Sequence, residues 1–166
     1  MEALLLESAK AWVQVRNAYG SVKRDPMARY YTYTLLLQRG KFYVGSTDNI
    51  FVRLVDHMTM SPSSSLWVRE HGPVSRVVEI VRNSSRDDER YKTLEYMNLM
   101  GWENVRGAAH CRVDMRTPPS GLGLFCRDRA DFEYVDRREI NEILKHVAEL
   151  SQSLGKVAES PESQPE

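Results

Sequence analysis

The sequence has no excess of charge of either sign. Its 166 residues include 23 lysine and arginine residues and 23 aspartate and glutamate residues, so the net charge is zero. This balance argues against a histone-like or polybasic protein that binds nucleic acid through its overall charge. It does not exclude a local basic surface, because net charge does not say where the charges lie.

Cysteine is scarce and long apolar runs are missing. Cys111 and Cys126 have no zinc-site spacing around them, even when the neighbouring His110 is counted, so we expect reduced thiols. No stretch reaches the roughly 18 apolar residues that suggest a membrane span. The acidic start MEALLLESAK does not match a signal peptide. We therefore expect a soluble intracellular protein of the cytoplasm or nucleus, with no targeting segment and no membrane partner.

The sequence does contain alternating strand-like and helix-like segments. Tyrosine, threonine and β-branched residues predict strands over residues 30–38, 41–46 and 74–82. Helical spacing and capping residues predict helices over 2–18, 47–58, 84–100 and 136–154, with Thr47 or Asp48 as one cap. The short turn Arg39-Gly40-Lys41 makes the first two strands an antiparallel hairpin. The expected fold class is α+β, a small three-stranded antiparallel sheet flanked by helices, with extra N- and C-terminal helices.

This order predicts one main domain with extensions at both ends. Residues 1–28 are expected to form an N-terminal helical extension and residues 29–112 the domain itself. Residues 113–156 are expected to form a C-terminal loop and helix packed on that domain. The end of the chain, residues 157–166, is expected to be disordered, because SPESQPE has too little apolar content to pack.

One short stretch, FYVGSTDNIFVRLVDH, concentrates functional side chains. Its Tyr43 has the same parity about the hairpin turn as Tyr33, so both are predicted on one face of the sheet. Arg53 and His57 are four residues apart and share one surface of the following helix. Gly45 lies between strand and helix, where the chain has to turn sharply or admit a ligand closely. These residues are therefore predicted to converge on one concave face.

The helix over 84–100 offers a carboxylate to this face. Glu95 lies in the middle of a stripe formed by Tyr91, Leu94, Asn98 and Leu99 at helical spacing. A buried carboxylate is costly unless it is paired or bound to a metal, so Glu95 is a candidate metal ligand. The alternative is that the core stripe consists of Thr93, Met97 and Met100, which leaves Glu95 in solvent.

These residue types suit the hydrolysis of a phosphodiester bond. The reaction needs a group that activates water, a cation that offsets negative charge in the transition state, and a metal that holds the phosphate oxygens. One carboxylate is enough for magnesium, which keeps several waters as ligands. Spacing alone leaves the structural alternative open, because tyrosines in strands usually pack and arginines on helices are usually solvated.

Two motifs resemble the GIY-YIG nuclease superfamily. Tyr43-Val44-Gly45 is close to the second motif of the family, and the spacing to Arg53 and on to His57 also matches. The first motif, Tyr31-Thr32-Tyr33, keeps only its last residue. Further on, LEYMNLMGWENVRG is similar to versions found in large DNA viruses and phages, although Ala108 stands where the second glycine of an Asn-Val-Arg-Gly-Gly stretch is found. The resemblance covers about residues 30 to 111.

The resemblance implies a metal-dependent DNA endonuclease and a role for each matching residue. Tyr33 would be the general base or would orient water, with Tyr43 as its partner, Arg53 on the phosphate and His57 assisting a tyrosine. Glu95 would hold Mg²⁺ or Mn²⁺. The expected substrate is DNA, including branched DNA, in repair, recombination or a viral process. The residues expected to contact it are Tyr31, Lys41, Gly45, Asn104 and Arg106.

Two alternatives remain open at this point. The degenerate first motif is compatible with a GIY-YIG-fold module that binds nucleic acid with weak turnover or none. A further alternative is an interaction protein that acts through its terminal helices. Cleavage assays with magnesium, and the salt dependence of DNA binding, distinguish the three hypotheses.

Overall fold

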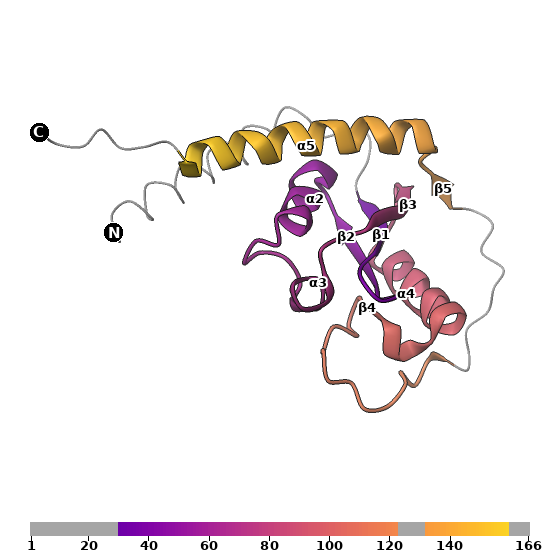
Figure 1. Cartoon of the computed structure of the whole chain (residues 1–166). Coiled ribbons are helices and arrows are strands. Elements are labelled where there is room, and N and C mark those ends of the chain that lie inside the picture. Colours follow the sequence, from indigo (N-terminus) through magenta and orange to yellow (C-terminus); the bar gives the residue numbers. More distant parts are fainter. Residues whose placement is uncertain (1–29, 123–131, 160–166) are drawn as a thin grey trace, which may run out of the picture.

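The computed structural model describes residues 30–122 and 132–159 (Figure 1). The described chain forms a five-stranded mixed sheet with strand order β4-β2-β1-β3-β5 and four α-helices around it. The expected α+β class is therefore confirmed, but the sheet is larger than the three strands that the sequence predicts.

The three predicted strands form the centre of the sheet. They are β1 (Tyr31–Leu36), β2 (Phe42–Thr47) and β3 (Arg76–Arg82). β1 pairs antiparallel with both of its neighbours, and in this register Tyr33 lies opposite Gly45. Tyrosine, threonine and β-branched residues fill these strands, because such side chains pack well on a pleated surface.

Two short strands extend the sheet at its edges. β4 (Val105–Gly107) runs parallel to β2, and β5 (Glu133–Tyr134) runs antiparallel to β3. Strands of three and two residues are too short to show an alternating pattern, so the sequence does not predict them. β4 ends opposite Val44, so among the described residues the outer edge of β2 has no strand partner from Gly45 to Thr47.

The helices begin at capping residues. α2 (Ile50–Met58) is capped by Asn49 rather than by the expected Thr47 or Asp48. α3 (Leu66–His71), which the sequence does not predict, is a six-residue helix capped by Ser65. α4 (Arg86–Met100) begins with a capping box in which Ser85 and Asp88 exchange hydrogen bonds, and it ends at Gly101, whose φ is 89°. A short 3₁₀-helix, η1 (Trp102–Asn104), then leads into β4.

α5 (Arg137–Glu159) is the longest helix, and it packs against α2 and β3 along one side of the molecule (Figure 1). It continues past residue 157, where the sequence predicts that the disordered tail begins. Residues 1–28 and 160–166, for which we expect a helical extension and the rest of the tail, lie outside the described residues. Among the described helices, none is both long and apolar enough to cross a membrane.

The sheet separates two hydrophobic cores. The first lies between the sheet and helices α2, α3 and α5, and it contains the odd-numbered side chains of β1 together with Tyr43. The second lies between the opposite face and α4, and it contains Phe42, Val44 and Met97. Because successive side chains of a strand point to opposite faces, the parity of a residue decides which core it enters.

We expect Leu54 to contribute strongly to stability, because it belongs to the first core and is 0% exposed. Leu54→Ala should lower the free energy of unfolding by about 2 to 5 kcal/mol, through lost burial and a residual cavity. Leu66, on α3, is 57% exposed and provides a matched control; Leu66→Ala should change stability by no more than about 0.5 kcal/mol. Urea unfolding curves compare the two variants, and equal losses would contradict this assignment of the core.

Candidate functional site

The hydroxyl of Tyr33 lies at the centre of a buried polar cluster. The side chain of this β1 residue is 0% exposed. Its Oη lies 2.7 Å from Nε2 of His57 and 3.3 Å from Nε of Arg53, which donates a hydrogen bond to it. Both partners come from α2, where their i, i+4 spacing turns them toward the same strand. The tyrosine therefore joins the sheet to the helix through polar contacts rather than apolar packing alone.

Gly45 makes this arrangement possible. A Cβ atom at residue 45 would lie 2.3 Å from Oη of Tyr33 and 2.5 Å from its Cζ, far closer than non-bonded atoms approach. The sequence predicts a glycine that serves a sharp turn or the approach of a ligand. In the structure, Gly45 instead leaves room on β2 for the neighbouring tyrosine ring.

Tyr43 completes the aromatic part of the cluster. Its ring meets the His57 ring edge-on, with centroids 5.2 Å apart, and its centroid lies 6.3 Å from that of Tyr33. The side chains of Tyr33, Tyr43, Arg53 and His57 therefore lie together on one face of the sheet, as the parity of the strands and the spacing on the helix predict.

Arg53 is the member of this cluster that reaches the surface. Its Nη1 donates to the carbonyl of Ser63 at 2.6 Å and lies 3.7 Å from the buried carboxylate of Asp56. The side chain keeps 25% of its surface exposed. These contacts fix the guanidinium at the entrance to the cluster, where it could meet an anion from solvent.

His57 is held in its neutral form. Burial, and then the positive charge of Arg53, lower the pKa of its imidazole from 6.5 to about 3. Its second ring nitrogen, Nδ1, lies 2.8 Å from Oγ of Ser64. A neutral imidazole has one donor and one acceptor nitrogen, so His57 can link Tyr33 to Ser64 and take up a proton only at an energetic cost.

Burial also keeps both tyrosines protonated. It raises the pKa of Tyr33 well above 10.0, and the mutual repulsion of the two tyrosines adds to this effect, while Arg53 opposes it. The pKa of Tyr43 is also raised by burial, and Arg53 again acts in the opposite direction. The free protein therefore favours hydroxyl groups, not phenolates, at this site.

Glu95 does not join the cluster, so the expected convergence is wrong at this residue. Its carboxylate lies on the opposite face of the sheet, where it borders a hollow of about 320 Å³ together with Phe42 and Glu79. Glu95 Oε2 and Glu79 Oε1 each lie 3.0 Å from Nζ of Lys92. The cost of burying this carboxylate is offset by a lysine rather than by a metal.

Besides Asp56, a second carboxylate near the cluster belongs to Glu89, on the first turn of α4. Its Oε2 accepts a hydrogen bond of 2.7 Å from Oγ of Ser46, the residue after Gly45. The negative charge of Glu89 contributes to the raised pKa of both Tyr33 and Tyr43. Glu89 also lies beside the part of β2 that β4 leaves uncovered.

The sequence does contain a signal for Glu89. Thr93 and Met97, two members of the alternative core stripe, are fully buried, whereas Met100 is largely exposed. Extending that stripe back by four residues reaches Glu89, whose backbone carbonyl accepts from Oγ1 of Thr93. This stripe thus contains the correct helix face, although its periodicity alone does not select it over the stripe of Glu95.

Arg106, Lys41, Asn104 and Tyr31, four of the residues expected to contact substrate, have other roles. Four of the five N–H groups of Arg106 donate to backbone carbonyls of residues 102, 105, 112 and 113, and the side chain is buried. Lys41 donates to Oδ1 of Asn104 at 2.9 Å. Lys41 immediately precedes β2, about 13 Å from Gly45, and its ammonium group is already engaged by Asn104.

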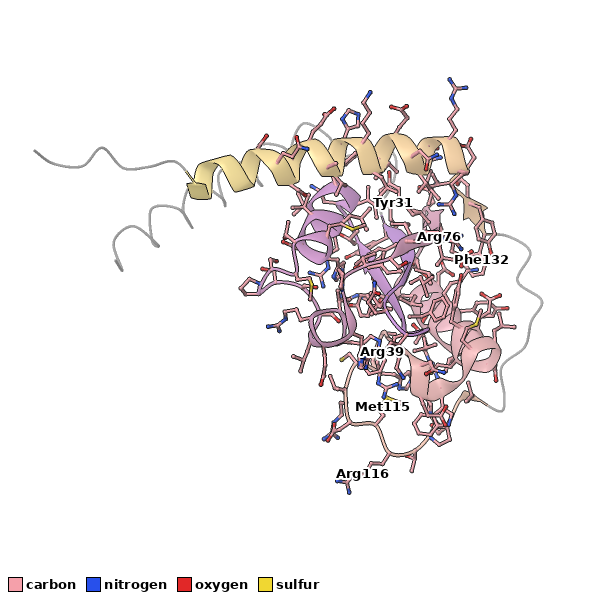
Figure 2. The ribbon with its side chains drawn as sticks, in the orientation of Figure 1. Tyr31, Arg39, Arg76, Met115, Arg116 and Phe132 are labelled. Atoms are coloured by element: carbon pink, nitrogen blue, oxygen red, sulfur yellow. The ribbon has the colours of Figure 1, made fainter. Side chains whose placement is uncertain are left out.

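Tyr31 is buried in the first core rather than exposed to a ligand. Figure 2 shows it at the end of the sheet that lies beneath α5, whereas Arg39 marks the hairpin at the other end. Burial lowers the pKa of Arg82, but the negative charge of Glu139 and a hydrogen bond with the Tyr31 hydroxyl together raise it above its ordinary value. Tyr31 therefore supports the packing of β1 against its surroundings.

We expect Gly45→Ala to destabilise the protein, because the added methyl group would overlap the Tyr33 hydroxyl. The free energy of unfolding should fall by about 1 to 3 kcal/mol, as it does when a well-packed core is overfilled. Gly121→Ala is a suitable control, since its Cβ would lie 3.4 Å from the flexible end of Arg90. Thermal unfolding of both variants is the measurement, and equal stability would contradict a role for Gly45 in accommodating Tyr33.

The pKa of His57 predicts a loss of stability in mild acid. Because its pKa is about 3 in the folded state against 6.5 ordinarily, the unfolded chain binds the proton more readily. Above pH 6.5 His57 is neutral in both states, so it does not lower the free energy of unfolding. As the pH falls from 6.5 toward 3, protonation of the unfolded chain lowers that free energy progressively. Between pH 6.5 and about 4.5 the protein should lose about 2 kcal/mol through this group. His57→Gln should show a correspondingly flatter dependence in urea unfolding, and parallel pH curves would refute the assignment.

Comparison with known proteins adds no further information about the site. No protein-family model, no curated protein and no solved structure matches this chain. Any assignment of function therefore rests on the geometry of the cluster and on the residues that build it.

Proposed function

We propose that this chain is a divalent-metal-dependent DNA endonuclease of the GIY-YIG type, which hydrolyses phosphodiester bonds in DNA repair, recombination or the processing of branched DNA. The observation that carries the proposal is the position of the Tyr33 hydroxyl, between Nε2 of His57 and Nε of Arg53 and opposite Gly45. In this proposal the protein acts in the cytoplasm or nucleus, where DNA is present.

Arg53 is suited to stabilise the phosphate. It is always protonated, it is partly exposed, and Tyr33, Ser63 and Asp56 fix its position before any substrate binds. A preorganised donor aimed at developing negative charge lowers the barrier of such reactions, and the loss of one donor typically costs about a hundredfold to a thousandfold in rate.

Glu89 is the residue best placed to hold the metal, in place of Glu95. Its carboxylate is half-buried, oriented by Ser46 and electrostatically coupled to both tyrosines. The described residues contain no group of three or more His, Cys, Asp or Glu side chains that could bind a metal. A single carboxylate suits Mg²⁺ or Mn²⁺, since Mg²⁺ keeps several waters and takes phosphate oxygens as further ligands. When bound, the ion would neutralise charge on the scissile phosphate.

The hydroxyl of Tyr33 and the imidazole of His57 would handle the proton of the attacking water. The tyrosine oxygen accepts from Arg53, and the neutral imidazole next to it has an acceptor available for a proton. The two residues are therefore arranged to orient water. Passing a proton from it through Tyr33 to Nε2 of His57 would carry an energetic cost, because burial lowers the pKa of the imidazole and raises that of Tyr33, an effect that Arg53 partly offsets.

The alternative function is a nucleic-acid-binding module with weak turnover or none. A specific observation favours it, namely that Tyr33 is 0% exposed and its pKa is raised well above 10.0. A hydroxyl so enclosed has to gain access to water before it can act as a base. DNA binding alone would still depend on phosphate contacts and would weaken as salt concentration rises.

Two glutamates on α4 provide a matched test of the proposal. Glu89→Gln should reduce Mg²⁺-dependent cleavage of plasmid and branched oligonucleotides by at least about a hundredfold, because the metal loses its carboxylate. Glu95→Gln should retain cleavage, because Glu95 lies six residues, or about 9 Å, further along α4 from Glu89 and pairs with Lys92. Initial rates are measured at matched protein stability. Arg53→Ala serves as a second variant that should lose activity, because it removes the phosphate contact but keeps the carboxylate proposed to hold the metal.

The outcomes separate the competing functions. Loss of activity in Glu95→Gln but not in Glu89→Gln would return the metal to the position that the sequence suggests. Salt-dependent DNA binding without cleavage by the unmodified chain would support the binding module. If neither cleavage nor salt-dependent DNA binding occurs, both functions are wrong.

A further inference from the structure

The loop before α3 contacts the residues of α2 that build the site. Three serines of the stretch Ser61–Ser65 contact functional residues of α2, and each does so differently. Ser61 donates through its hydroxyl to Asp56, Ser63 accepts from Arg53 through its carbonyl, and Ser64 meets His57 through its hydroxyl. The sequence predicts only a polar connection here, because short-range pattern does not show which side chains of a loop turn inward.

Ser64 makes the contact with the greatest consequence. Its side chain is buried, in contrast to the exposed Ser63 beside it. Its Oγ lies 2.8 Å from Nδ1 of His57, whose Nε2 lies 2.7 Å from Oη of Tyr33. Arg53 closes the series by donating to the same tyrosine oxygen. The four residues form one chain of hydrogen bonds from the loop to the entrance of the site.

Arg53 fixes the direction at one end of this chain of hydrogen bonds, and the partner of Nδ1 decides whether the other end can follow. Arg53 can only donate, so Oη of Tyr33 is an acceptor toward it. A hydroxyl that accepts from a cation becomes a stronger donor, because hydrogen bonds in a chain polarise one another. This favours the arrangement in which the Tyr33 hydroxyl donates to Nε2 of His57. In this tautomer, Nδ1 of the neutral ring carries the proton and donates a hydrogen bond to Oγ of Ser64.

We propose that Ser64 is a positioning residue that holds His57 in the Nδ1–H tautomer, so that Nε2 accepts from Tyr33. The hydroxyl of Ser64 can rotate to present its oxygen to Nδ1, which a methyl group at this position cannot do. The catalytic consequence rests on the proposed function, since the tautomer sets which way the Tyr33 hydroxyl is turned. The tautomer itself can be tested whether or not the chain cleaves DNA.

Long-range ¹H–¹⁵N NMR spectra of the full chain measure the tautomer directly, because protonated and unprotonated ring nitrogens resonate in separate regions. The signals of His57 are identified by their absence from His57→Gln. We expect the Nδ1–H form in the unmodified protein at neutral pH. Ser64→Ala should lose most of this form in favour of Nε2–H, and Ser64→Thr, which keeps the hydroxyl, should retain it. Ser63→Ala serves as the control for the tautomer, since the exposed neighbour leaves Ser64 in place.

Each result decides the proposal. An Nε2–H tautomer in the unmodified protein overturns it even if Ser64→Ala does not fold, and so does an unchanged tautomer in a folded Ser64→Ala. If the chain is a nuclease, Ser64→Ala should also reduce cleavage about tenfold, at the lower end of the effect of removing a residue that orients a functional group, and Ser64→Thr should restore it. A loss of the Nδ1–H form in Ser64→Ala without any cleavage by the unmodified chain supports the role of Ser64 and refutes only the nuclease function.

Discussion

The close approach of the Tyr33 hydroxyl to the backbone of β2 is the constraint on which the site depends. The Tyr33 ring lies directly over Gly45 of β2, and its hydroxyl contacts Arg53 and His57 of α2. The loop before α3 contacts both of these side chains in turn. Each contact buries a polar group that has to find a partner, so the cluster forms completely or at considerable cost. Stability and chemistry at this face therefore depend on the same atoms.

The sequence predicts this half of the site well, because its signals are local. Strand parity places Tyr33 and Tyr43 on one face, and the i, i+4 spacing brings Arg53 and His57 to that face from α2. The central strands and α4 are likewise determined by short-range patterns and capping residues. The Asn49 cap shows the limit, since Thr47, Asp48 and Asn49 are all competent caps and only the path of the chain selects one.

The carboxylate could not be predicted in the same way, because two helical stripes of α4 are equally regular. Choosing between them requires knowing that Lys92 is buried and neutralises Glu95, which is a tertiary fact. Arg106 illustrates the same limit, because a basic residue that binds backbone carbonyls and one that binds phosphate are indistinguishable in sequence. The short strands β4 and β5 depend entirely on long-range pairing.

The buried Lys92, on the α4 side of the sheet, affects the position of Glu89 through the helix that carries both residues. Lys92 lies three residues after Glu89 on α4, and it contacts Glu79 of β3, Glu95 and the hydroxyl of Tyr134. Replacing Lys92 would leave the carboxylates of Glu79 and Glu95 without their counter-charge, and the helix would relax to solvate them. Rotation or tilting of α4 would carry the Glu89 carboxylate away from Ser46. A mutational map of this protein would therefore show sensitive positions on both sides of the sheet, with one group far from every residue that meets the substrate.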